Sequence, residues 1–101
     1  MAKLTWTEPA LRQLEEIIEF IALDKPEAAR RVALSIFDTT DNIESFRLLG
    51  RKIPEFPVEG YRQIWIRPCW LYYRIIADEI FILHVRRAES PFRIEFIEDE
   101  K

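Results

Sequence analysis

The sequence predicts an α+β domain with two layers, in which a pair of helices covers one face of a small sheet. Two observations lead to this prediction. Residues 8–46 contain two successive stretches with apolar side chains at helical spacing, and residues 61–87 contain three runs rich in β-branched and aromatic residues. Of the 101 residues, 49% are hydrophobic and only two are glycine, so we expect one domain spanning residues 1–101.

The N-terminal segment is expected to form a short strand and then the first helix. Residues 3–6 have an extended pattern, Thr7 is suited to cap the free amides of a helix, and Pro9 is tolerated in the first turn. Apolar side chains then recur at spacings of three and four: Leu11, Leu14, Ile17, Ile18 and Ile21. This pattern predicts an amphipathic helix that ends near Leu23.

A second helix is predicted to follow almost at once. Asp24 is its expected cap, Pro26 lies in its first turn, and helical spacing continues to about Phe46. Because the connection has only two or three residues, the two helices should form an antiparallel hairpin. Glycines and prolines interrupt residues 47–60, which we expect to be an irregular connection.

Residues 61–87 are predicted to form a three-stranded antiparallel meander. If Asp78 is the centre of the last turn, Tyr72 lies opposite His84 and Trp70 lies opposite Arg86. Side chains alternate with period two, so one face is apolar and should pack under the helices: Leu71, Tyr73, Ile75, Phe81, Leu83 and Val85. A two-residue loop at 68–69 adds Ile64 and Ile66 to this face, whereas a three-residue loop would place them on the other. We prefer the two-residue loop because it leaves one wholly apolar face.

The opposite face of the meander mixes aromatic and charged side chains and is free to meet a partner. It carries Trp70, Tyr72, Arg74, His84 and Arg86 beside Ile76, Ile80 and Ile82. The initial strand should pair with one edge of the meander, but the sequence does not indicate which. Residues 91–97 alternate apolar and charged side chains in a strand-like pattern without an assigned partner, so the structure of 91–101 is left open.

Composition narrows the possible functions. The net charge of −3 argues against a protein whose main task is to grip phosphate backbones. The single cysteine, Cys69, excludes an internal disulfide and fits a reducing compartment, and no secretory or membrane-spanning segment is visible, so we expect a cytoplasmic protein. One His, one Cys and no phosphate-binding glycine loop indicate neither a metal site nor a cofactor.

Four stretches together resemble the ParE branch of the ParE/RelE toxin superfamily, in the right order and spacing to about Ala88. They are LTWTEPALRQLEEI at 4–17, PEAARRV at 26–32, YYRI at 72–75 and IFILHVRR at 80–87. The resemblance implies a RelE/ParE-like fold and the toxin of a type II toxin–antitoxin pair, held in a hetero-oligomer by a ParD-like antitoxin. It also implies that the freed toxin inhibits DNA gyrase by binding, without a membrane or direct nucleic-acid partner, whereas RelE-like relatives cleave mRNA on the ribosome.

The residues favour binding over RNA cleavage. Cleavage through the 2′-hydroxyl needs a base, an acid and cations around the phosphate, and Arg74, His84 and Arg86 are the set that could supply part of this. However, Trp70 stands where the ribonucleases tend to have a basic residue, and the C-terminal aromatic residue, Phe96, has no hydroxyl. A gyrase-binding toxin is therefore preferred; a RelE-like ribosome-dependent endoribonuclease and an inactive homologue that binds only antitoxin remain as alternatives.

Two contact surfaces are predicted. The target should meet the mixed sheet face and its end, formed by Trp70, Tyr72, Arg74, His84, Arg86 and Arg87. Three Trp, seven Phe and three Tyr exceed what one thin core readily hides, so a further apolar surface should await the antitoxin. We assign to that surface Ile18, Phe20, Phe92, Ile94 and Phe96, while the last three could instead close the core.

Overall fold

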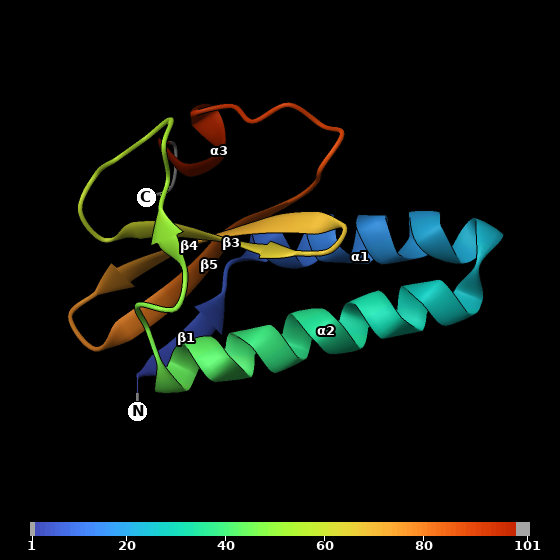
Figure 1. The fold of residues 1–101 in the computed structure, drawn as a ribbon, viewed down its shortest axis with the longest axis horizontal. Coiled ribbons are helices and arrows are strands. Elements are labelled where there is room, and N and C mark those ends of the chain that lie inside the picture. The colour runs from blue at the N-terminus through green and yellow to red at the C-terminus, as the bar shows by residue number, and fades with distance from the viewer. Residues whose placement is uncertain (1, 99–101) are drawn as a thin grey trace.

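In the computed structural model, which describes residues 2–98, a five-stranded sheet lies between a helical hairpin and the C-terminal segment (Figure 1). The strands follow the order β1-β5-β4-β3-β2, and only β1 runs parallel to its neighbour, β5. The predicted α+β class is confirmed. In chain order the elements are β1 (Lys3–Trp6), α1 (Glu8–Asp24), α2 (Pro26–Ser45), β2 (Arg51–Lys52), β3 (Tyr61–Ile66), β4 (Cys69–Ile76), β5 (Glu79–Arg87) and α3 (Glu95–Glu98).

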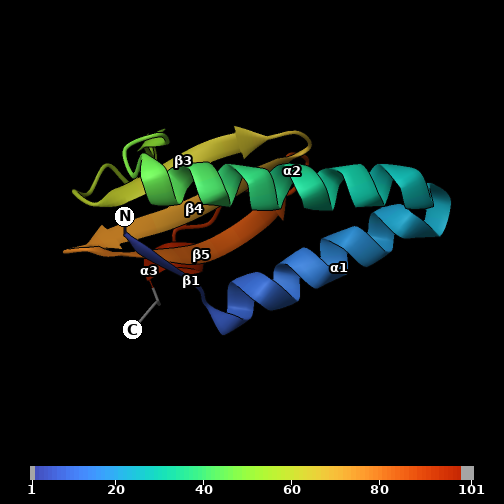
Figure 2. The ribbon, with the colours of Figure 1, turned by 90° about the horizontal axis from the view of Figure 1, so that it is seen from below.

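The helical hairpin is confirmed, with one correction at its connection (Figure 2). The Thr7 Oγ1 accepts a hydrogen bond from the Ala10 amide, as predicted, and also donates one of 2.8 Å to the Ile82 carbonyl on β5. Asp24 does not cap α2. It is the last residue of α1, because the helices are joined by the single extended residue Lys25, whose amide donates to the Ile21 carbonyl.

The hairpin β4–β5 contains an irregularity that the predicted register missed. Tyr72 lies opposite His84 as expected, but the next pair is Tyr73 with Ile82, so Leu83 has no partner in the ladder. The tight turn is Ala77–Asp78, with Ala77 at a φ of 54°. Because side chains alternate along a strand, this one-residue bulge reverses the faces of the β5 residues that lie between it and the turn.

The bulge corrects the predicted core. Ile80 and Ile82 face the helices, whereas Phe81 and Leu83 lie on the opposite face of the sheet. The other assigned side chains of β4 and β5 pack on the helical side as predicted: Leu71, Tyr73, Ile75 and Val85. The β3–β4 turn is Arg67–Pro68, one residue earlier than expected, which changes the pairing of β3 with β4 by two residues. Because an even shift keeps each side chain on its face, Ile64 and Ile66 still pack on the helical side of the sheet.

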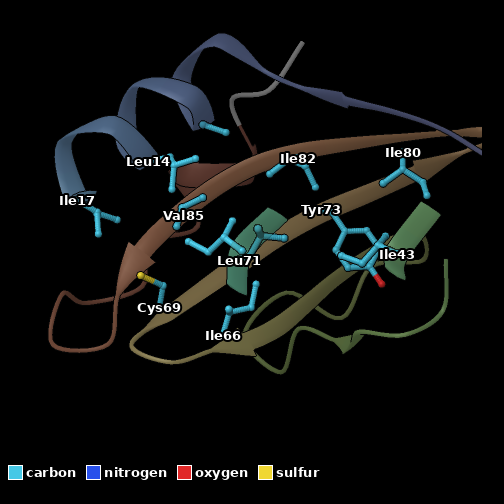
Figure 3. Close-up of a cluster of buried hydrophobic side chains, with 12 residues drawn as sticks. Leu14, Ile17, Ile43, Ile66, Cys69, Leu71, Tyr73, Ile80, Ile82 and Val85 are labelled. Atoms are coloured by element: carbon cyan, nitrogen blue, oxygen red, sulfur yellow. The ribbon is translucent and has the colours of Figure 1, made fainter. Parts of the chain in front are cut away.

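The main core joins both helices to the three central strands (Figure 3). Tyr73 is fully buried there, and its hydroxyl donates to the Arg47 carbonyl and accepts from the Gly50 amide, both at 2.8 Å. A Cβ at Gly50 would lie 2.7 Å from the Gln63 carbonyl oxygen, so glycine is required. These contacts order the connection after α2, where we expected no regular structure and where β2 pairs with β3.

A second, smaller core lies on the other face of the sheet. Its buried members are Ile53, Tyr72, Leu83 and Ile97, with Phe92 and Phe96 packed against them. The expected strand at 91–97 is not formed: this segment crosses over the sheet face and ends in the short helix α3. The edge of β5 was not available, because β1 already pairs with it. Residues 99–101 lie outside the described part of the chain.

Candidate partner-binding site

Arg86 connects the sheet to the start of the C-terminal segment. Its Nε donates a hydrogen bond of 2.8 Å to the Tyr72 hydroxyl, and its Nη1 donates one of 2.6 Å to the Ser90 carbonyl. Nη1 also lies 3.4 Å from the carbonyl oxygens of Arg87 and Ala88. The guanidinium is therefore engaged in holding the chain where it leaves β5.

His84 lies under the C-terminal segment. Its ring stacks on that of Phe96, with centroids 3.8 Å apart and an angle of 9° between the planes, and the residue is 7% exposed. Burial, assisted by the positive charge of Arg86, lowers the pKa of His84 from 6.5 to about 4. The imidazole is thus neutral at neutral pH, and a neutral imidazole has lost the readily donated proton of a general acid.

The depressed pKa predicts acid sensitivity. Between pH 6.5 and about 4 the unfolded chain holds a proton on His84 that the folded chain lacks. The free energy of unfolding therefore keeps its full value above pH 6.5 and decreases as the pH is lowered towards 4. We expect a loss of about 3 kcal/mol across this pH range, measured by urea unfolding at several pH values. A His84→Phe variant should lose this part of the pH dependence; an unchanged profile would contradict the assignment.

A groove runs between α1 and the C-terminal segment, with a volume of about 360 Å³. Phe20 of α1, which is 55% exposed, forms one wall, and the Arg87 guanidinium carbon lies 4.2 Å from the centroid of its ring. Phe96 and His84 line the same groove, together with Glu16 and Ser90. The groove therefore offers apolar rings beside two arginine side chains, of which Arg86 is already engaged in hydrogen bonds. This arrangement suits the binding of a protein side chain.

The structure unites part of the predicted antitoxin set. Phe20 and Phe96 line the same groove, although one belongs to α1 and the other to α3. Ile18 is directed to the main core, while Phe92 packs on Tyr72 with ring centroids 5.3 Å apart. Ile94 is 38% exposed and does not line the groove.

The predicted target set is also divided. Tyr72 and His84 are buried beneath the C-terminal segment, whereas Trp70, Arg74, Arg86 and Arg87 are only partly buried. The Arg74 guanidinium carbon lies 4.9 Å from the centroid of the Tyr61 ring, and Arg87 pairs with Glu89 at 2.9 Å. Three charged or polar groups named for RNA cleavage, Arg74, His84 and Arg86, thus do not face one open cavity.

Two residues of this region were not singled out from the sequence. Trp65 is 46% exposed and its ring centroid lies 5.2 Å from that of Trp70, so the two indoles form one surface. The predicted β3–β4 register already placed them on one face, which was the available signal. Gln13, whose Oε1 accepts a hydrogen bond of 3.0 Å from the Val85 amide, gave no such signal because α1 and β5 meet only in the fold.

Comparison with known proteins identifies the family. The family model described as "ParE toxin of type II toxin-antitoxin system, parDE" matches residues 4–92. The chain belongs to the ParE toxin family. The resemblance stated from the sequence is therefore confirmed, and this ParE toxin is the toxin component of a type II toxin–antitoxin system.

Relatives of this ParE toxin agree with the family match. It is 32% identical over 92 residues to a Sinorhizobium fredii protein named "Putative toxin Y4kP", covering 89% of this chain and 92% of that one. Its fold is similar to a chain of the "Chromosomal ParDE TA system from P. aeruginosa", with a TM-score of 0.73, 26% identity, and coverage of 88% of this chain and 98% of that one.

The described part of this ParE toxin contains neither a membrane-spanning helix nor a cluster of metal-binding side chains. No helix within residues 2–98 is long and apolar enough to cross a bilayer. Within the same residues, no three His, Cys, Asp or Glu side chains gather in a way that could hold a metal ion. Cys69 is buried, and burial raises the pKa of its thiol to about 11, which disfavours the reactive thiolate.

Proposed function

We propose that this ParE-family toxin inhibits DNA gyrase by binding it, and that a ParD-type antitoxin neutralises it. The observation that carries the proposal is the family match over residues 4–92. Gyrase acts on the bacterial chromosome, so the proposal also implies a cytoplasmic protein. The proposed target surface is the exposed part of the mixed sheet face, around Trp65, Trp70 and Arg74.

The geometry of the alternative set supports binding over RNA cleavage. His84 is stacked under Phe96 with a lowered pKa, and the Arg86 guanidinium is already bound to Tyr72 and to backbone carbonyls. A ribonuclease needs an acid and a base that reach the scissile phosphate, together with cations that stabilise the charge developing there. Neither group is free to do this in the conformation described.

A supercoiling assay tests the target. Purified gyrase, relaxed plasmid and ATP are incubated with increasing concentrations of the toxin, and the products are separated by electrophoresis. We expect supercoiling to be lost, and to be restored when a ParD-type antitoxin is added in equimolar amount. Full supercoiling at every toxin concentration would exclude gyrase as the target.

The proposed antitoxin contact rests on the α1 groove. The similar Pseudomonas chain comes from a structure of a ParDE system, and the groove here presents the exposed ring of Phe20 beside Arg87. An amphipathic helix that places an apolar side chain against Phe20 and a carboxylate near Arg87 would complement both. The same contact would leave the Trp65 and Trp70 pair uncovered.

Phe20→Ala tests this contact. Exposed aromatic side chains at the centre of an interface commonly contribute about 2 kcal/mol, so we expect antitoxin affinity to fall by about thirtyfold, measured by isothermal titration calorimetry. Leu34→Ala on α2, which removes a side chain of similar exposure, is the control and should leave the affinity unchanged. An unaltered Phe20→Ala affinity would place the antitoxin elsewhere.

A further inference from the structure

A second pocket is lined by residues that follow α2 and by residues of β2, β3 and β4. Figure 2 shows that α2 ends, and β3 begins, at the end of the molecule opposite the connection between the two helices. The pocket has a volume of about 210 Å³ and is formed where the chain leaves α2 and where β2 meets β3. Tyr61 and Ile75 form its apolar wall, and Gly60, at a φ of 93°, turns the chain into β3 beside it. None of its residues lines the α1 groove.

The pocket is positively charged although the chain carries a net charge of −3. Three cations, Arg47, Lys52 and Arg62, line it together with one carboxylate, Glu59. Glu59 lies 3.8 Å from Lys52 and its side chain is 92% exposed, so solvent screens the pair and its energetic contribution is small. Surplus positive charge in a largely acidic protein favours an anionic ligand.

One of the three cations, Arg62, is held in place by a hydrogen bond without being neutralised by a carboxylate of residues 2–98. Arg62 donates a hydrogen bond of 2.6 Å to the Gly50 carbonyl, and Gly50 is itself bound to the buried Tyr73 hydroxyl. Among residues 2–98, the recorded ion pairs give neither Arg47 nor Arg62 a carboxylate partner. A carboxylate brought to this pocket would therefore meet the preorganised guanidinium of Arg62 and gain charge-assisted hydrogen bonds.

The rim of the pocket indicates which anion fits. Leu48 lines the pocket and is 62% exposed. Other exposed apolar residues are close to the lining residues in the sequence: Phe46 at 67%, Leu49 at 47% and Val58 at 43% exposure. A nucleic-acid backbone offers phosphates but no aliphatic groups for such side chains. A peptide that alternates carboxylates with apolar residues supplies both, and β2, an edge strand, leaves one side open for an extended segment.

We propose that this pocket and its rim are a docking site for an acidic, apolar peptide segment of a partner protein. Its carboxylates bind Arg47, Lys52 and Arg62, and its apolar side chains cover Leu48 and Leu49. The site is separate from the α1 groove and from the Trp65 and Trp70 pair. Its test does not depend on gyrase inhibition, so failure of either proposal would be distinguishable from failure of the other.

The test uses a fluorescein-labelled peptide of alternating glutamate and leucine, with binding followed by fluorescence anisotropy. We expect saturable binding to the full chain and a loss of affinity of about tenfold or more in the double variant Arg47→Gln, Lys52→Gln. The double variant Arg30→Gln, Arg31→Gln removes the same charge from exposed positions at the other end of α2 and should bind as the unaltered chain does. Arg62 is left unchanged because its hydrogen bond to Gly50 also supports the fold.

Two further probes separate the competing ligands. A peptide with lysine in place of glutamate should not bind, and a single-stranded oligonucleotide should bind more weakly than the acidic peptide. Equal losses in the two double variants, no peptide binding, or preference for the oligonucleotide would each overturn the proposal. Circular dichroism melting of both double variants verifies that they are folded before binding is compared.

Discussion

Replacing Ile97 with alanine is expected to lower the free energy of unfolding by about 3 kcal/mol, the usual cost of removing a fully buried isoleucine side chain. Ile97 has no exposed surface and packs with Ile53, Tyr72 and Leu83 on the face of the sheet away from the helices. The loss should be measured by urea unfolding at neutral pH.

The matched control is Ile94→Ala, three residues earlier in the same segment. Ile94 is 38% exposed, so the same truncation should cost less than about 1 kcal/mol. Equal effects of the two substitutions, or no effect of Ile97→Ala, would show that the C-terminal segment does not cover the sheet in solution. Tyr72 and His84 would then be open to partners after all.

Replacing Trp70 with alanine is expected to raise the toxin concentration that half-inhibits gyrase supercoiling by about thirtyfold, as for a tryptophan at the centre of an interface. Trp70 is partly buried against the second core, and its ring pairs with that of Trp65, which is 46% exposed on the mixed face. The measurement is the gyrase assay described above, with melting temperatures confirming that the variant is folded.

Leu34→Ala serves as the control here, because it removes an exposed apolar side chain from α2, away from the mixed sheet face. It should inhibit gyrase as the unaltered chain does. If the Trp70→Ala variant inhibits gyrase at the same concentration as the unaltered chain, the proposed target surface is wrong, although gyrase would still be the target.

Local patterns were sufficient to predict most of the fold. The cap at Thr7, the helical spacing along both helices and the alternation in β3 and β4 each depend on neighbouring residues, and each is confirmed. The bulge at Leu83 could not be predicted in this way, because isoleucine and phenylalanine alternate so that either face of β5 could be buried. Asp24 failed as a cap because one linking residue leaves it inside α1.

The candidate site was harder to predict, because its contacts join distant parts of the chain. The sequence placed Tyr72, His84 and Arg86 on one face, but their burial depends on Phe92, Phe96 and Ile97 crossing that face. An alternating segment is typical of a strand, but β1 occupies the edge of β5, and the segment packs on the face of the sheet instead. The contact between Phe20 and Arg87 likewise needs the packing of α1 on β5.

Gyrase inhibition in the cell can be tested by expressing the chain without antitoxin in growing bacteria. Plasmid supercoiling, the DNA-damage response and mRNA integrity are followed in the same culture. We expect supercoiling to be lost and the damage response to be induced while mRNA remains intact. Early mRNA cleavage with normal supercoiling would contradict this expectation and favour a ribosome-dependent nuclease. Unimpaired growth would contradict it as well, and would indicate a homologue that binds antitoxin only.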